Sequence, residues 1–114
     1  MMLEALSAFD YYHVLDARQD PSLVCFTKPS CGGCRTLKKI LLEEPPTVPS
    51  LRCFEVQVED AYGLVEELDI LHLPTMLLYY KGDLHREIFS VLRPEAIQQA
   101  IEKALRLPPE DDRQ

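Results

Sequence analysis

Residues 23–34 read LVCFTKPSCGGC, a short apolar run that leads through a proline into two cysteines separated by two glycines. The run at residues 22–27 is typical of a central strand buried on both faces. Pro29 and Ser30 end this strand, and apolar residues at helical spacing begin at Cys34. The segment therefore predicts a buried strand that passes directly into a helix, with the cysteine pair at the junction.

Hydrophobic periodicity and turn-forming residues predict the other elements of the chain. Helices are expected at residues 8–18, 34–43, 61–68 and 94–107, and strands at residues 51–58, 76–80 and 84–91, with residues 2–6 either a short strand or the chain end. A helix between consecutive strands predicts parallel pairing, whereas the tight turn at residues 81–83 predicts an antiparallel hairpin. The expected fold class is α/β, with a mixed central sheet of parallel strands plus a C-terminal β-hairpin, flanked by helices on both faces.

Chain length and composition predict one domain. The sequence has 114 residues, of which 46% are hydrophobic and 27% are charged, enough to close a single core. We expect a domain over residues 1–107 and a flexible tail over residues 108–114, because a proline ends the last helix. The net charge is −7 and lysine and arginine are not clustered, which excludes nucleic acid as the main partner.

No membrane segment is expected from the sequence. The longest apolar stretch, residues 71–80, is interrupted by a histidine and a proline and is too short to span a bilayer. Residues 1–9 contain no lysine or arginine and therefore lack the pattern of a secretory signal. We therefore expect a cytoplasmic protein that makes no membrane contact.

The chain has four cysteines, Cys25, Cys31, Cys34 and Cys53. Without a secretory signal, a C-x-x-C pair favours a redox or metal-binding role over a disulfide framework. Cys25 and Cys53 lie in apolar strands, and buried free thiols commonly pack as small hydrophobic side chains. We expect them to be core thiols, and a disulfide between them is the weaker alternative.

The placement of the Cys31–Cys34 pair predicts thiol–disulfide chemistry. A cysteine at a helix N-terminus faces unpaired backbone N–H groups and the positive end of the helix dipole, which stabilise its thiolate. Cys34 is close enough in sequence to reach the sulfur of Cys31 and release a mixed disulfide. Gly32 and Gly33 have no Cβ, so a substrate backbone can approach closely. The prediction is an oxidoreductase in which Cys31 attacks and Cys34 resolves.

Two basic residues flank this pair. Lys28 and Arg35 can add positive potential beside Cys31 and help to stabilise its thiolate. The alternative is that both are solvated surface charges, which usually contribute little.

A metal site is the less favoured interpretation of the same motif. A structural zinc site needs a second pair of ligands at a suitable distance from C-x-x-C. The remaining candidates are Cys25, Cys53 and three scattered histidines, which form no such pair. We expect no metal and no bound cofactor, and a metal or iron–sulfur module remains the third alternative.

The segment LVCFTKPSCGGC resembles the active-site segment of the thioredoxin family, and Leu73-Pro74-Thr75 resembles that family's cis-proline turn. The resemblance covers residues 7–107 and implies the thioredoxin fold. It also implies that Pro74 is cis and packs against Cys31, and that an extended substrate docks on the turn formed by Leu73, Pro74 and Thr75.

Several residues depart from the family pattern. Ser30 and Thr27 stand where the family has aromatic residues, which alters the substrate-facing surface. Cys25 stands where thioredoxins keep a buried aspartate that moves a proton to and from the resolving cysteine, and Glu55 stands where they have a lysine. We therefore hypothesise that Glu55 transfers the proton of Cys34, or that no group does and turnover is slow.

The sequence predicts a disulfide oxidoreductase that acts on protein or small-molecule disulfides. Electrons would come from an external reductase or from a thiol such as glutathione. The main alternative is a non-catalytic module that keeps the fold and uses its dithiol for redox sensing or protein interaction, because the usual aspartate and tryptophan are missing.

Overall fold

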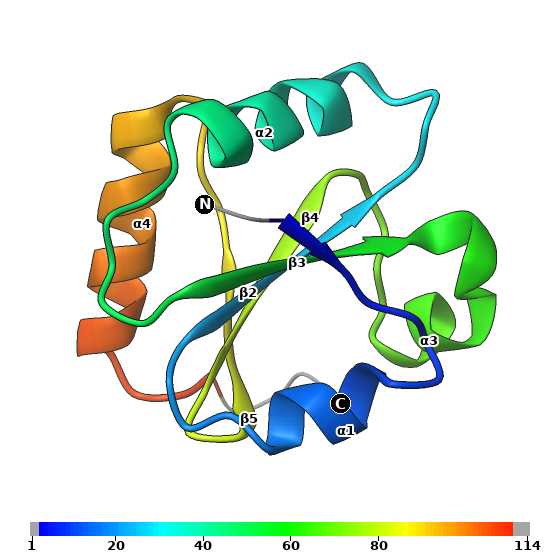
Figure 1. Ribbon diagram of the computed structural model, residues 1–114, viewed down its shortest axis with the longest axis horizontal. Coiled ribbons are helices and arrows are strands. Elements are labelled where there is room, and N and C mark those ends of the chain that lie inside the picture. Colours follow the sequence, from blue (N-terminus) through cyan, green and yellow to red (C-terminus); the bar gives the residue numbers. More distant parts are fainter. Residues whose placement is uncertain (1–2, 111–114) are drawn as a thin grey trace.

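The structure is a computed structural model that describes residues 3–110 (Figure 1). The strands are β1 (Leu3–Ala5), β2 (Ser22–Thr27), β3 (Arg52–Gln57), β4 (Thr75–Tyr80) and β5 (Asp83–Ile88). The helices are α1 (Tyr11–Asp16), α2 (Gly32–Glu43), α3 (Tyr62–Glu67) and α4 (Pro94–Arg106), and a 3-10 turn, η1 (Val58–Asp60), precedes α3.

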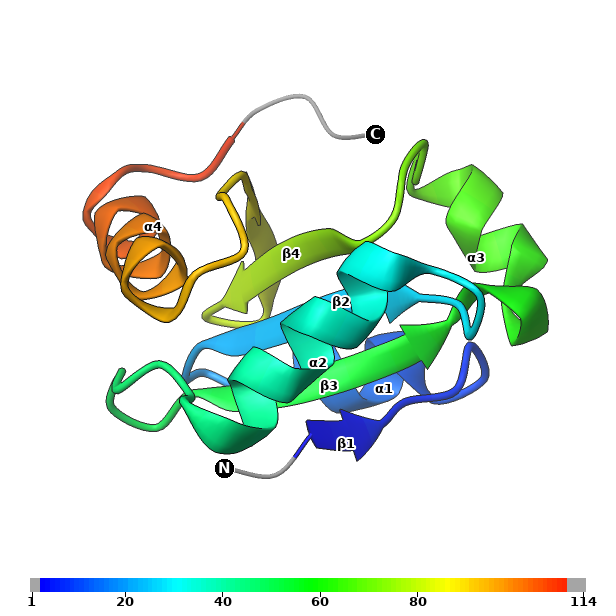
Figure 2. The ribbon, with the colours of Figure 1, turned by 90° about the horizontal axis from the view of Figure 1, so that it is seen from above.

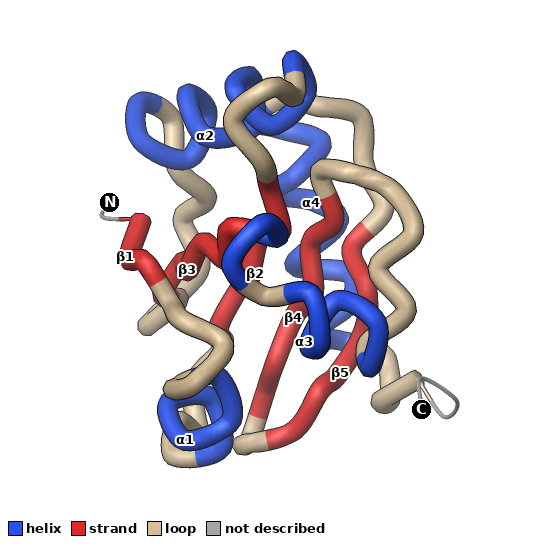
Figure 3. Tube along the Cα trace, turned by 90° about the vertical axis from the view of Figure 1, so that its right-hand side faces the viewer, coloured by secondary structure: helices blue, strands red, loops and turns tan. Residues whose placement is uncertain are grey.

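The strands form one mixed sheet in the order β1-β3-β2-β4-β5. β1 and β2 both run parallel to β3, whereas β4 runs antiparallel to β2 and β5 antiparallel to β4. β1 and β5 are therefore the edges of the sheet (Figure 3). This arrangement confirms the predicted α/β class, with parallel strands followed by a C-terminal hairpin.

The sheet divides the core into two apolar clusters, and helices cover both (Figures 1 and 2). On one face α1 and α3 pack against Val24, Phe26, Phe54, Val56, Leu77 and Tyr79. On the other face α2 and α4 pack against Leu23, Cys25, Cys53, Met76, Leu78 and Ile88. The alternation read from the sequence of β3 therefore corresponds to its two buried faces.

The first helix begins later than the sequence predicts. A capping-box pattern at residues 7–10 favoured a start at Ala8, but α1 begins at Tyr11. The Ser7 Oγ does accept a hydrogen bond from the Asp10 N–H, at 3.1 Å, but residues 8–10 form a turn. This local side-chain bond closes the turn and leaves the helix to begin after it.

The last strand is shorter than predicted, because β5 ends at Ile88 rather than Val91. Ile88 pairs with Met76, close to the start of β4 at Thr75. Pro74 precedes that start and has no N–H to continue the ladder. Residues 89–93 therefore leave the sheet and lead to α4.

The residues after α4 return to the sheet edge. The Pro108 carbonyl accepts a hydrogen bond from Arg86 Nε, and the Glu110 N–H donates to the His85 carbonyl, both at 2.8 Å. The beginning of the expected tail thus contacts β5, and residues 111–114 lie outside the described residues. None of the helices within residues 3–110 combines the length and the apolar character that crossing a membrane requires.

Candidate functional site

The two cysteines of CGGC lie where β2 has ended and α2 begins. Cys31 is the N-cap residue of α2, with extended backbone angles, and its sulfur accepts a hydrogen bond from the Cys34 N–H at 3.1 Å. Cys31 and Cys34 are bonded as a disulfide, with their Cα atoms 5.2 Å apart. The same N–H that contacts the sulfur here can stabilise a thiolate on Cys31 when the bond is open.

The two sulfur-bearing residues differ in accessibility. Cys31 is partly exposed, whereas Cys34 is only 1% exposed. A substrate disulfide can therefore reach Cys31 first, and Cys34 can act only on what is already attached to it. The greater exposure of Cys31 agrees with the order expected from the sequence, in which Cys31 attacks and Cys34 resolves.

The loop before β4 lies against the start of α2. The Leu73–Pro74 peptide bond is cis, as the family resemblance implied. A Cβ added at Gly33 would lie 3.1 Å from Pro74 Cδ and 3.6 Å from a methyl group of Leu92. Gly33 thus makes room for Pro74, whereas a Cβ at Gly32 would meet no atom closer than 3.8 Å. Gly32 is therefore the less crowded of the two glycines, with only the Arg35 guanidinium within ordinary contact distance of an added Cβ.

Thr75 holds the loop from inside. Its side chain is buried, and its Oγ1 donates a hydrogen bond to the His72 carbonyl at 2.5 Å. Its backbone pairs with Phe26 in the sheet. The side chain of Thr75 is therefore not part of the surface that a substrate can touch. Leu73 and Pro74 are both partly exposed, and Leu73 lines a groove together with Cys31.

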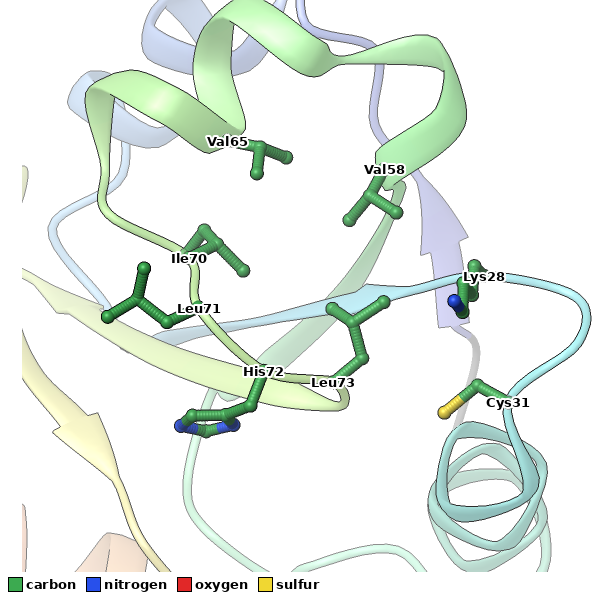
Figure 4. A pocket seen from close by; sticks show the side chains of 8 residues that line it. All are labelled: Lys28, Cys31, Val58, Val65, Ile70, Leu71, His72 and Leu73. Carbon is green, nitrogen blue, oxygen red and sulfur yellow. The ribbon is translucent and has the colours of Figure 1, made fainter.

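A groove of about 450 Å³ adjoins Cys31 (Figure 4). It is lined by Lys28, Cys31, Val58, Val65, Ile70, Leu71, His72 and Leu73. Lys28 and Cys31 lie near one another at one end, and Val65, Ile70 and Leu71 lie toward the other (Figure 4). Sequence reasoning missed its apolar wall, because Val65 and Ile70 follow the same apolar pattern as core residues.

Lys28 and Arg35 occupy different positions at the site. Lys28 is exposed and lines the groove with Cys31. The Arg35 guanidinium donates a hydrogen bond to the Pro29 carbonyl at 3.2 Å. This contact ties the Arg35 side chain to the loop that precedes Cys31. Lys28 is therefore the basic residue that shares a cavity with the exposed sulfur.

Glu55 lies on the sheet face that α2 covers, opposite Cys25 in the β2–β3 register. Its side chain is only 13% exposed. Its Oε2 atom accepts from Thr27 Oγ1 at 2.6 Å and from Gln57 Nε2 at 3.3 Å, and it forms an ion pair with Lys38 Nζ at 3.0 Å. These donors compensate the charge of a carboxylate that has been largely removed from water.

Lys38 was not predicted as part of the site. It lies one turn beyond Cys34 on α2, between the buried residues Leu37 and Leu41. That position at the edge of the apolar stripe was the only signal available, and it is also typical of an ordinary solvated lysine. Only the packing of α2 over β3 brings Lys38 to Glu55.

Cys25 and Cys53 are buried and are not part of a disulfide. Removal from water, together with the nearby Cys53 and Glu55, raises the pKa of Cys25 far above its ordinary value. Burial also raises the pKa of Cys53 to about 12. Cys53 pairs with Leu23, two residues before Cys25, so the two thiols are not directly opposite each other on the neighbouring strands, and they form no disulfide.

No group of three or more histidine, cysteine, aspartate or glutamate side chains within residues 3–110 could hold a metal ion. Cys31 and Cys34 are bonded to each other, and the other two thiols are enclosed in the core under α2. This geometry gives no support to the metal or iron–sulfur alternative.

Comparison with known proteins places these features in a family. The family model described as Thioredoxin matches residues 3–103, which is most of the chain. The chain belongs to the thioredoxin family. A Cys-x-x-Cys pair in a thioredoxin-family chain supports thiol–disulfide oxidoreductase chemistry in general.

Curated thioredoxins are distant relatives of this chain. Thioredoxin M5, chloroplastic, of Oryza sativa subsp. japonica is 25% identical over 84 residues, covering 73% of this chain and 49% of its own length. A thioredoxin of Ophiophagus hannah is 27% identical over 81 residues, which cover 71% of this chain and 76% of that thioredoxin. The chain spans about half the length of the chloroplastic thioredoxins of rice and wheat that it matches.

Solved structures confirm the thioredoxin fold. The thioredoxin of Malassezia sympodialis superposes with a TM-score of 0.74 at 17% identity, covering 90% of each chain. The thioredoxin of Trypanosoma brucei brucei superposes with a TM-score of 0.76 at 15% identity, covering 92% of each chain. At this level of identity the likeness concerns the fold alone.

Proposed function

We propose that this protein is a disulfide reductase that exchanges its Cys31–Cys34 dithiol with protein or small-molecule disulfides. The thiolate of Cys31 attacks one sulfur of the substrate, and the other sulfur leaves as a thiolate. Cys34 then loses its proton and attacks the Cys31 sulfur, which releases the second substrate thiol and forms the Cys31–Cys34 disulfide. An external reductase or a thiol such as glutathione supplies the two electrons that reopen it.

One observation carries this proposal. The partly exposed Cys31 caps the N-terminus of α2, the buried Cys34 is already bonded to it, and Gly33 between them lies against Pro74 of the cis-proline loop. An attacking sulfur must be accessible and easily ionised, whereas a resolving sulfur must be close and protected. The exposure of Cys31 and its position at the helix N-terminus support the attacking role, and the burial of Cys34 supports the resolving role.

The cis-proline loop is the proposed docking element. Leu73 and Pro74 are partly exposed next to Cys31, so the backbone of Leu73 can pair with an extended substrate segment. The buried Thr75 would support the loop from below. Gly32 is exposed at the start of α2, where a substrate backbone would approach.

Glu55 is the proposed proton-transfer group for the resolving step. It is an acidic side chain buried under α2, and it faces Cys25, which occupies the place of the usual aspartate. Glu55→Gln is expected to change the pH dependence with which Cys34 releases a mixed disulfide. Lys38→Met removes the ion pair but keeps the carboxylate, so an equal effect of both variants would indicate a structural role instead.

Insulin reduction in the presence of a small dithiol tests the proposal. The wild-type protein should accelerate the precipitation of the insulin B chain, Cys31→Ser should abolish the acceleration, and Cys53→Ala should retain it. Absence of reduction by a wild-type protein whose CGGC pair still opens and closes would contradict the reductase and favour a redox-sensing module.

A further inference from the structure

The residues that line the groove beside Cys31 include a lysine and no acidic residue, although the protein as a whole is acidic. The chain contains 19 acidic residues and carries a net charge of −7, yet none of the residues that line the groove is acidic. Lys28 is the only lysine or arginine among them, and most of the other lining residues are apolar (Figure 4). The groove thus combines apolar side chains with one lysine, which lies at the end where the sulfur is.

The Lys28 ammonium is available to a ligand. Within residues 3–110 the ion pairs join Lys38 to Glu55, Arg52 to Glu4, and His72 to Glu87, and none of them involves Lys28. Lys28 is exposed at the groove rather than folded against an acidic neighbour. A carboxylate entering the groove would therefore find a cation without having to displace another carboxylate.

We propose that the groove selects disulfides whose half-cystine is adjacent to an acidic residue and is followed by an apolar side chain. Lys28 binds the carboxylate, and the wall formed by Val65, Ile70 and Leu71 receives the apolar side chain. The inference rests on the proposed reductase activity and specifies its substrate class. Lys28 is then a specificity-determining residue in addition to any effect on the Cys31 thiolate.

The order of features along the groove sets the order of residues in the substrate. The substrate sulfur must meet Cys31, and Lys28 lies at the same end of the groove (Figure 4). Val65, Ile70 and Leu71 lie toward the other end of the groove, so the apolar side chain belongs further along the peptide than the cysteine and the acidic residue. An extended peptide segment meets these requirements, and a volume of about 450 Å³ is in the range of specific ligand sites.

The charge preference can be measured with matched peptide disulfides. Each peptide carries one cysteine joined to the same small leaving thiol, and the peptides differ only in having Glu, Gln or Lys beside that cysteine. Single-turnover reduction by the wild-type dithiol should be fastest for Glu, about two- to fivefold faster than for Gln, and slowest for Lys. The ratio of rates cancels any change in the intrinsic reactivity of Cys31.

Two lysine variants decide whether Lys28 is responsible. Lys28→Glu should reverse the order of the Glu and Lys peptides. Lys39→Glu changes the net charge equally at an exposed position of α2 outside the groove, and it should keep the wild-type order. An unchanged order in Lys28→Glu, or a reversal in both variants, would overturn the inference.

Two leucine variants test the apolar wall. Leu71 lines the groove and is 87% exposed, whereas Leu42 is 51% exposed on α2 outside it, so neither change should disturb the core. Leu71→Ser should lower the preference for an apolar over a serine side chain in the peptide by about two- to fivefold, and Leu42→Ser should not. An equal effect of both variants would contradict the assigned wall.

The inference and the proposed function can fail separately. If insulin is reduced through Cys31 but the peptides show no charge preference, the reductase stands and the substrate class is wrong. If neither insulin nor any peptide is reduced, the proposed function itself is wrong.

Discussion

Cys25 and Cys53 have surroundings that oppose ionisation, unlike the cysteine at the tip of α2. Both lie in the apolar cluster between the sheet and α2, and burial raises the pKa of each. These thiols stay protonated in the folded protein at pH values where the thiol of an unfolded chain ionises. Their protonation therefore links the stability of the fold to pH.

The free energy of unfolding should fall at alkaline pH because of these thiols. An unfolded cysteine ionises near pH 8.5, so above that pH the unfolded state binds fewer protons than the folded state, which favours unfolding. For Cys25, the loss should approach about 1.4 kcal/mol per pH unit. Denaturant unfolding under reducing conditions should show the gap between wild type and Cys25→Ala shrinking above about pH 8.5. A gap that stays constant up to pH 10 would contradict the assigned environment of Cys25.

Single residues were predictable where their chemistry has a sequence signature. Cys31 and Cys34 stood out because the spacing and the following helix define a redox pair. Lys38 did not, because a lysine beside an apolar stripe is common, and its partner Glu55 lies on a strand that follows in the chain. Contacts of this kind depend on how a helix is seated on the sheet, which periodicity does not determine.

At the scale of elements, the contact between α2 and the cis-proline loop controls the geometry of the site. Gly33 is in the first turn of α2, and a Cβ added there would crowd Pro74 at 3.1 Å, whereas a Cβ added at Gly32 would make only an ordinary contact with Arg35 at 3.8 Å. The two glycines therefore offer a matched pair of substitutions.

Gly33→Ala should be less stable than Gly32→Ala by about 1 kcal/mol. Both variants gain helix propensity, but only the Gly33 variant must push the Pro74 ring away from the helix. Thermal unfolding measures the difference. Equal stability of the two variants would show that the loop does not depend on this contact.

Element types followed from the sequence, but some boundaries did not. β2 was predicted at its observed bounds, because a proline precedes it and another closely follows it. β5 was predicted to extend to Val91, because its apolar alternation continues past Ile88. The strand ends where its neighbour on the sheet runs out, and this depends on pairing rather than on local propensity.

At the scale of the whole molecule, the chemistry lies at the end of the central parallel strand β2. α2 begins after this strand, and the cis-proline loop enters β4, which is the neighbour of β2 on the other side. The sheet thus brings together segments that are about 40 residues apart in sequence. The fold could be predicted from the order of elements, whereas the groove could not, because its lining residues come from three separate segments, at residues 28–31, 58–65 and 70–73.

The C-terminal residues contribute to stability rather than to the site. Residues 108–110 bond to β5 on the edge of the sheet, and they do not line the groove beside Cys31. A chain that ends at Leu107 should fold and should reduce insulin as fast as the full chain. If the lost contacts contribute about 1 kcal/mol, its melting temperature should be about 4–8 °C lower. Loss of activity at a temperature where the shortened chain is folded would contradict this division.

The most direct test of the central claim is covalent trapping with the two single-cysteine variants of the CGGC pair. Cys34→Ser keeps the attacking sulfur and lacks the resolving one, so it should hold a disulfide substrate as a stable mixed disulfide on Cys31, identified by mass spectrometry. Cys31→Ser should trap little, because Cys34 is only 1% exposed. Preferential trapping on Cys34, or no adduct in either variant, would contradict the claim that Cys31 attacks and Cys34 resolves.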